Sequence, residues 1–369
     1  MIKIVHMADC HLDSSLSGLP AQIADFRRHH LASAFSDALA YAAYNDTNIL
    51  LIPGDLFDTP IAGQGSANQL AGFARSNPET YIFIAPGNHD SIVGNNYISA
   101  LSAFPNIHIF KSGAMEKVDI SELNVCVYGY GCVQTHNEER LLENFWAEDS
   151  GRVNLMCFHG LLQGYGGHAP YNPITKDDIA QSGLDYIALG HVHTYSGIHS
   201  LGMVNYAYSG CLLGRGFDET GAKGFIAGCI DKGVCELEFI ESNYPAFERV
   251  FVDCTGATDS VDIVARVRDA VSAFADASYV SIILEGYVRS DLIINRAVVA
   301  NSVNRFIFVK VDDKTKPMQD YIKLSNEQSL RGMFIKTVLE SGADEQTMQK
   351  AISLGLAALS GEELNMDEY

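Results

Sequence analysis

Short apolar runs alternate with polar and glycine-rich turns along most of this chain, and few of the runs have helical spacing. The runs predict strands at Lys3–Met7, Asn48–Pro53, Thr80–Ala85, Ile107–Phe110, Asn124–Tyr130, Val153–Phe158, Tyr186–Leu189, Val204–Tyr208, Gly224–Ile230 and Val234–Ile240. Helices are predicted at Phe26–Tyr44 and Gln69–Ser76. So many strands with so few helices favour an α/β fold in which two packed sheets form a β-sandwich flanked by helices, rather than one doubly wound sheet.

A polar turn at Asn243-Tyr244-Pro245 marks a predicted domain boundary. Beyond it, strands and helices alternate in a compact α+β pattern, at 247–254, 259–274, 279–285 and 305–311. Two amphipathic helices follow at Leu330–Leu339 and Asp344–Leu359. The predicted division is therefore 1–244, a small capping domain at 245–322, and C-terminal helices at 323–369.

Composition restricts the class of protein. The chain has 369 residues, of which 47% are hydrophobic and 19% charged, as in a globular protein. No apolar stretch is long enough to span a bilayer, and Met1 leads directly into the strand-like Ile2–Val5 without a secretory signal. The eight cysteines form no C-x-x-C pair. We therefore expect a cytoplasmic protein with reduced thiols.

The formal net charge of −20 argues against binding nucleic acid through surface lysines alone. An enzyme that acts on nucleic acid would then obtain local positive charge from divalent metals or from a partner protein.

Five polar blocks carry side chains that bind metal ions, and each follows a predicted strand. They are Asp9-Cys10-His11, Gly54–Asp58, Gly87–Asp90, Phe158–Gly160 and Gly190–His193. The candidate ligands within them are Asp9, His11, Asp55, Asn88, His159, His191 and His193. If the first block is extended, Cys10 should point away from the metals, because neighbouring residues alternate faces.

Two carboxylates, one amide oxygen and four imidazoles are too many ligands, and too rich in oxygen, for one structural zinc site. They fit two ions that share a bridging carboxylate, for which Asp55 is the natural candidate because its block lies centrally among the others. Mixed oxygen and nitrogen ligation favours manganese, iron or zinc over magnesium. Two such ions activate water and stabilise displacement at a phosphate, so the blocks predict phosphoester hydrolysis.

His89 lies beside a ligand and is the predicted catalytic histidine, either donating to a phosphate oxygen or protonating the leaving alkoxide. Such an imidazole needs an orienting acceptor. Asp58 is the predicted acceptor, and Asp90 is the competing candidate.

The five blocks resemble the calcineurin-like metallophosphoesterase superfamily, whose pattern is D-x-H, G-D-x-x-D, G-N-H-D, H and G-H-x-H. Within it, the chain is most similar to SbcD- and YhaO-type DNA-repair exonucleases, bacterial relatives of the nuclease in the eukaryotic MRN complex. The narrower similarity rests on Met7–Asp13, on His168–Tyr171 before Asp185–His191, and on Tyr208–Cys211 before Gly216–Gly224. Ser209 stands where the family commonly has proline.

The resemblance implies one metal on Asp9, His11, Asp55 and His193, and a second on Asp55, Asn88, His159 and His191. It makes His89 the catalytic histidine. It also implies manganese, a homodimer, and DNA as substrate in double-strand-break repair. The partner would be an SMC-like coiled-coil ATPase of the SbcC or YhaN type, docked on the C-terminal helices, although those helices are equally compatible with packing on their own domain.

Other interpretations remain open. A small-molecule phosphodiesterase or phosphatase of the same superfamily would use the same ligands, whereas a non-catalytic scaffold would be expected to have lost some of them. Arg27, Arg28, His29 and His30 form either a phosphate-binding cluster or a solvated helix face. His168 lies in a glycine-rich loop that either lines the substrate site or is plain surface.

Overall fold

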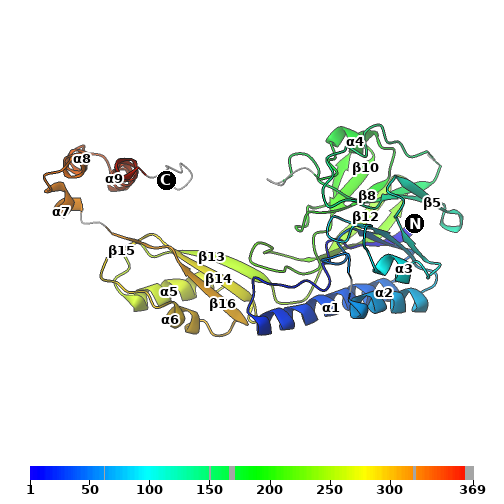
Figure 1. Ribbon diagram of the computed structural model, residues 1–369, viewed down its shortest axis with the longest axis horizontal. Helices are drawn as coiled ribbons and strands as arrows, with labels where there is room; N and C mark the ends of the chain where they lie inside the picture. Colours follow the sequence, from blue (N-terminus) through cyan, green and yellow to red (C-terminus); the bar gives the residue numbers. More distant parts are fainter. Residues whose placement is uncertain (62, 149–150, 166–170, 319–320, 362–369) are drawn as a thin grey trace. The chain divides into compact units, whose positions relative to one another are not determined.

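The computed structural model describes residues 1–61, 63–148, 151–165, 171–318 and 321–361. Contacts divide the chain into two compact units (Figure 1). The first comprises residues 1–249, 274–280 and 305–308, and the second comprises 250–273, 281–304 and the residues from 309 onward. The predicted separation of a capping domain from C-terminal helices within the second unit stays a prediction.

Two six-stranded mixed sheets form the first unit. The first has the order β12-β11-β1-β2-β3-β4, with β1 Ile2–His6, β2 Ile49–Pro53, β3 Tyr81–Ala85, β4 Ile107–Ile109, β11 Gly224–Asp231 and β12 Val234–Glu241. The second has the order β5-β6-β7-β8-β10-β9, with β5 Glu116–Ile120, β6 Val125–Tyr130, β7 Val153–His159, β8 Tyr186–Gly190, β9 His199–Leu201 and β10 Val204–Tyr208. The central strands are parallel and the outer hairpin strands antiparallel.

A continuous apolar layer joins the two sheets. Strands β2 and β3 of the first sheet pack on β7 and β8 of the second. Leu51 and Phe83 from one side, and Leu155 and Ala188 from the other, are almost completely buried in this layer. Strands buried on both faces explain why the sequence shows unbroken apolar runs here rather than alternation. The predicted two-sheet α/β fold is confirmed.

Helices cover the outer faces of the sandwich (Figure 1). On the first sheet lie α1 Ala21–Tyr44, α2 Gln64–Ser76 and α3 Tyr97–Leu101, which share one apolar cluster with the sheet. On the second sheet lies α4 Lys176–Gln181, whose N-terminus carries a capping box between Thr175 and Asp178. A short 3-10 turn, η1 Ser121–Leu123, joins β5 to β6.

Beyond β12 the chain forms a three-stranded sheet of order β13-β14-β16, with β13 Phe247–Asp253, β14 Tyr279–Glu285 and β16 Phe308–Asp313. The second unit contains α5 Ser260–Ala270, α6 Arg296–Asn301, the paired β15 Tyr287–Val288 and β17 Lys316–Pro317, α7 Tyr321–Ser325, α8 Leu330–Leu339 and α9 Glu345–Ser360. No helix among the described residues is long and apolar enough to cross a membrane.

Arg27 in α1 is almost completely buried, which corrects the sequence-based picture of a basic helix face. Its Nε and Nη2 donate to the carbonyl of Gly214 at 2.9 and 2.6 Å, and Nη1 donates to the carbonyl of Pro245 at 2.6 Å. Its guanidinium also lies over the ring of Phe247. Arg27 therefore belongs to the interior, where it fixes two loops to α1.

Replacing Arg27 by Met should lower the free energy of unfolding of the first unit by roughly 3 kcal/mol, because buried carbonyls lose charged donors. Urea titration followed by the fluorescence of Trp146, the only tryptophan of the chain, measures this unit. Arg28→Gln is the matched control; Arg28 is partly exposed, pairs with Asp25 and donates to the carbonyl of Ser15 at the surface, so its loss should cost less than about 1 kcal/mol. Equal stability of the two variants would show that the Arg27 bonds contribute little.

Candidate metal centre

The ends of five parallel strands bring the predicted ligands together. Asp9, Asp55 and Asn88 lie in the loops directly after β1, β2 and β3 of the first sheet. His159 is the last residue of β7, and His191 follows the last residue of β8 in the second sheet. Both sheets therefore deliver ligands to one end of the sandwich, as expected where parallel strands terminate.

Several ligands have left-handed backbone conformations. Positive φ angles occur at Asp9 (48°), His11 (44°), Asp55 (48°) and His191 (104°). Such a conformation costs about 1–2 kcal/mol for a residue other than glycine, and it is tolerated where the surroundings hold it in place. The first block is thus not extended, although Cys10 still lies in the apolar cluster beneath the first sheet, away from the centre.

Three glycines allow the loops to approach one another. A Cβ on Gly54 would overlap the ring of His159, and one on Gly87 would overlap the carboxylate of Asp55. A Cβ on Gly190 would overlap the carbonyl oxygen of Pro53. The glycine in each of these blocks is therefore required by close packing around the ligands rather than by turn geometry alone.

Asp55 lies between two groups of ligand atoms. Its Oδ2 is 3.6 Å from Nε2 of His11 and also 3.6 Å from Nε2 of His159, and the carboxylate is almost completely buried. On one side, Nε2 of His193 lies 3.2 Å from Nε2 of His11 and 3.9 Å from Oδ1 of Asp9. The first group therefore comprises Asp9, His11 and His193 around Asp55.

The second group lies on the other side of Asp55. Nε2 of His159 is 3.0 Å from Oδ1 of Asn88. The His191 ring lies edge-on to His159, with ring centroids 5.2 Å apart, and stacks on Tyr171 at 5.3 Å. The backbone N–H of His191 donates to both oxygens of Asp9 at 3.0 Å, which ties the two groups together.

These distances fit metal ions. Two donors that share one ion at about 2.1 Å lie about 3.0–3.4 Å apart for angles between a right angle and the tetrahedral angle. The pairs His11–His193 and Asn88–His159 meet this condition at 3.2 and 3.0 Å. Because His11 and His193 each have a carboxylate acceptor at Nδ1, their Nε2 lone pairs face each other, and a cation between them removes the repulsion. The predicted ligands are thus arranged as a binuclear metal site requires.

In three of the imidazoles, the ring nitrogen that faces away from the centre, Nδ1, makes a hydrogen bond to an oxygen atom. His11 Nδ1 donates to Asp58 at 2.9 Å, and His193 Nδ1 donates to Glu219 at 2.7 Å. His159 Nδ1 donates to the carbonyl of Pro53 at 3.1 Å. Each bond selects the tautomer whose Nε2 lone pair faces the centre, which is how proteins prepare histidine ligands.

Comparison with known proteins agrees with this geometry. The model of the calcineurin-like phosphoesterase family matches residues 2–195. The chain belongs to this family. It is a metal-dependent phosphoesterase, and its His and Asp clusters around Asp55 are consistent with the binuclear metal site typical of the family.

Individual relatives are distant from this phosphoesterase. The uncharacterized metallophosphoesterase YhaO of Bacillus subtilis (strain 168) is 28% identical over 287 residues, which cover 73% of this chain and 68% of YhaO. The crystal structure of TT1561 of Thermus thermophilus aligns with 66% of this chain and 99% of its own, with a TM-score of 0.40 and 12% identity.

His89 projects from the third block of the phosphoesterase toward solvent. Its backbone N–H donates to Oδ1 of Asp55 at 2.9 Å, while its side chain is 45% exposed. The ring lies edge-on to His11 with centroids 4.8 Å apart. Its Nδ1 is 3.9 Å from Oδ1 of Asp58, so Asp58 lies beside His89 but makes its direct bond to His11.

Asp90, the other candidate partner of His89, instead accepts hydrogen bonds from the backbone of the ligand loops. Its carboxylate accepts from the backbone N–H of Gly87 at 2.7 Å and of Phe57 at 3.2 Å, and from the hydroxyl of Tyr97 at 3.0 Å. Burial, together with the nearby charge of Asp55, raises the pKa of Asp90 to about 6. Asp90 therefore joins the second and third ligand loops, and of the two candidates Asp58 is the one that lies beside His89.

Arg215 and Glu219 are parts of the site to which the sequence analysis assigned no role. Glu219 accepts from His193, and Arg215 donates to both Glu219 and Asp58 at 2.8 Å. Burial alone would raise the pKa of Glu219, but the bonds from His193 and Arg215 outweigh it and hold that pKa well below its usual range. The available signal was the local spacing of glycines, with Gly214, Gly216 and Gly221 surrounding both residues.

Two other histidines of the sequence are not among the candidate ligands. His6 is buried and bonded to Tyr186, as an interior histidine, and His168 lies outside the described residues.

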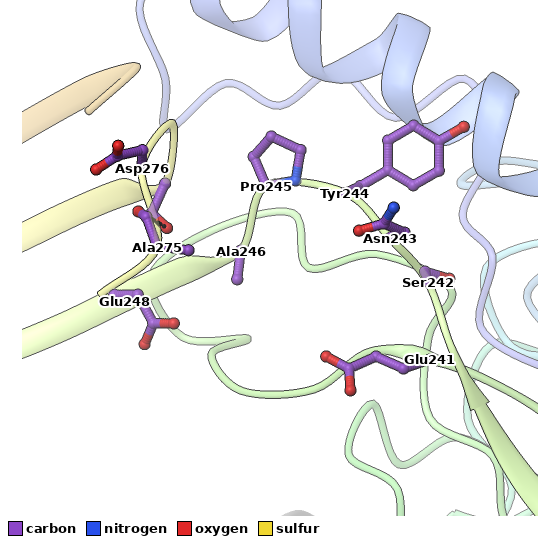
Figure 2. Close-up of a pocket in the computed structure, with 10 residues that line it drawn as sticks. Glu241, Ser242, Asn243, Tyr244, Pro245, Ala246, Glu248, Ala275 and Asp276 are labelled. Atoms are coloured by element: carbon purple, nitrogen blue, oxygen red, sulfur yellow. Dashed lines mark hydrogen bonds between the residues drawn. The ribbon is translucent and has the colours of Figure 1, made fainter. Parts of the chain in front are cut away.

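A pocket of about 680 Å³ is lined by the stretch Glu241–Ala246 and by Glu248 and Asp276 (Figure 2). It contains none of the predicted ligands, and its carboxylates would repel a phosphate.

Replacing Gly87 by Ala should displace Asp55 and weaken metal binding about ten-fold or more, because the added methyl group overlaps the Asp55 carboxylate. Calorimetric titration of the metal-free protein with Mn²⁺ measures this. Gly72→Ala in α2 is the matched control, since a Cβ there meets open space. Unchanged affinity in the Gly87 variant would contradict the central position of Asp55.

Proposed function

We propose that this phosphoesterase is a two-metal phosphodiesterase that cleaves DNA as an exonuclease or endonuclease in double-strand-break repair. The observation that supports it most is the position of Asp55 between the pairs His11–His193 and His159–Asn88, with His89 exposed beside them. In this proposal one ion is held by Asp9, His11, Asp55 and His193. The other is held by Asp55, Asn88, His159 and His191. Manganese is the proposed metal, with iron or zinc as alternatives.

The roles of the surrounding residues follow from their contacts. When bound, the two ions act as Lewis acids and make a water molecule acidic enough to supply the nucleophile. His89 is fixed through its backbone to Asp55 while its imidazole stays accessible, so it can donate a proton to the leaving alkoxide oxygen. Asp58 lies 3.9 Å from that imidazole and fixes His11 directly, so it positions both rings.

DNA as substrate is supported by the SbcD- and YhaO-like stretches of the sequence. The net charge of −20 means that most of the attraction for DNA must come from the metals and from a partner. We propose an SMC-like coiled-coil ATPase as that partner, and a cytoplasmic homodimer as the working form. In α8, Ile335 is buried while Leu330 and Met333 are exposed at 69% and 67%, which supports docking on these helices.

A small-molecule phosphodiesterase or phosphatase of the same family is the second candidate. The observation that favours it is the acidity of the chain, since a nucleotide or simple phosphodiester needs no extended basic surface.

Replacing His89 by Ala should reduce manganese-supported cleavage of linear duplex or single-stranded DNA by about 10²–10⁴-fold, because the leaving oxygen loses its proton donor. A labelled-DNA assay with metal titration measures the rate, with His136→Ala as the control; His136 is exposed and pairs only with Glu138 in the described contacts. Rapid turnover of a nucleotide without DNA cleavage, even beside the ATPase, would favour the small-molecule alternative.

A further inference from the structure

Arg215 connects two ligand loops that are far apart in the sequence. Its Nη1 donates to Oδ1 of Asp58 at 2.8 Å, and its Nη2 donates to Oε1 of Glu219 at 2.8 Å. Its Nε adds a longer bond to Glu219 at 3.2 Å, and its backbone N–H donates to Oε2 of Glu219 at 2.7 Å. The side chain is only 19% exposed. These bonds satisfy the guanidinium within the protein rather than leaving it free for a substrate.

Each carboxylate that Arg215 binds holds one imidazole of the same ligand group. Asp58 accepts from Nδ1 of His11 at 2.9 Å, and Glu219 accepts from Nδ1 of His193 at 2.7 Å. The two imidazoles face each other through Nε2 at 3.2 Å. The contacts therefore form a closed ring that runs from His11 through Asp58, Arg215 and Glu219 to His193 and back to His11.

The chemistry of this ring requires an arginine. Asp58 and Glu219 carry like charges that a single cation must neutralise in a mostly buried place. The planar guanidinium binds two carboxylates at once in a fixed geometry, whereas the ammonium of a lysine is a point charge on a flexible stem. The separation of Nη1 and Nη2 in the guanidinium therefore sets the distance between the carboxylates of Asp58 and Glu219. That distance in turn sets the spacing of the imidazoles of His11 and His193.

The ring is itself fixed to the scaffold. The carbonyl of Gly214, next to Arg215, accepts two bonds from the buried Arg27 of α1. The carbonyl of His193 accepts from Nζ of Lys223 at 2.8 Å. Support of this kind holds a site to within a fraction of an ångström, which a metal centre needs.

We infer that Arg215 is a positioning residue that sets the separation and orientation of His11 and His193, and so controls the affinity of one metal position of the pair. The inference rests on the proposed function, since it assigns these two imidazoles to the same ion. The other position is held differently, because His159 is anchored by the carbonyl of Pro53 and His191 by stacking on Tyr171. Losing Arg215 should therefore affect one ion and spare the other.

Calorimetric titration of the chelator-treated protein with Mn²⁺ tests this. His193→Ala and Asn88→Ala identify which of the two binding events belongs to each group. In Arg215→Gln, the event lost in His193→Ala should weaken about 10–100-fold, while the event lost in Asn88→Ala should stay within about twofold of the wild type. Arg215→Lys should remain weakened, because an ammonium cannot span both carboxylates.

Arg140→Gln is the matched control. Arg140 also bridges two carboxylates, of Glu143 and Asp178, and its hydrogen bonds within the described part of the chain reach only these residues and Thr175. Its variant should bind both ions as the wild type does. Equal weakening of both events in Arg215→Gln, unchanged binding, or full recovery in Arg215→Lys would overturn the inference. Failure of the wild-type protein to bind two ions would instead overturn the proposed function.

Discussion

Three histidines donate hydrogen bonds through the ring nitrogen that faces away from the centre, and these bonds determine which nitrogen can bind a metal. His11, His159 and His193 each donate through Nδ1, to Asp58, the carbonyl of Pro53 and Glu219 respectively. An imidazole can bind a metal only through a nitrogen that carries a lone pair. Fixing the proton on Nδ1 therefore leaves every Nε2 available at the centre, and the rest of the site is arranged to keep these acceptors in place.

The β-sandwich stabilises a strained arrangement. Left-handed backbone at Asp9, His11, Asp55 and His191 costs about 1–2 kcal/mol at each residue. That cost is offset by a continuous core between two sheets whose parallel strands end at the same place. The same convergence ties the loops together through the carboxylates of Asp9 and Asp90, so the candidate ligands lie close to one another.

The sequence predicted the long elements well, and the structure brings the predicted ligand blocks together, for physical reasons. Buried parallel strands are unbroken apolar runs, and each block begins where a run ends, so both leave a local signal. Short elements such as α3, α4 and β9 were missed because so few residues establish no periodicity. The role of Arg215 was missed for a different reason: its partner Asp58 is 157 residues away, and only folding brings them together. The burial of Arg27 was not predicted for the same reason, because its partners Gly214 and Pro245 are also distant in the sequence.

The assignment of two ions to the groups around Asp55 is tested most directly by crystals grown with Mn²⁺ and measured at the manganese absorption edge. We expect two anomalous peaks about 3.5–4 Å apart. One should be bounded by Asp9, His11, Asp55 and His193, and the other by Asp55, Asn88, His159 and His191. A single closed peak, or no peak under saturating Mn²⁺, would contradict a two-metal mechanism for this phosphoesterase.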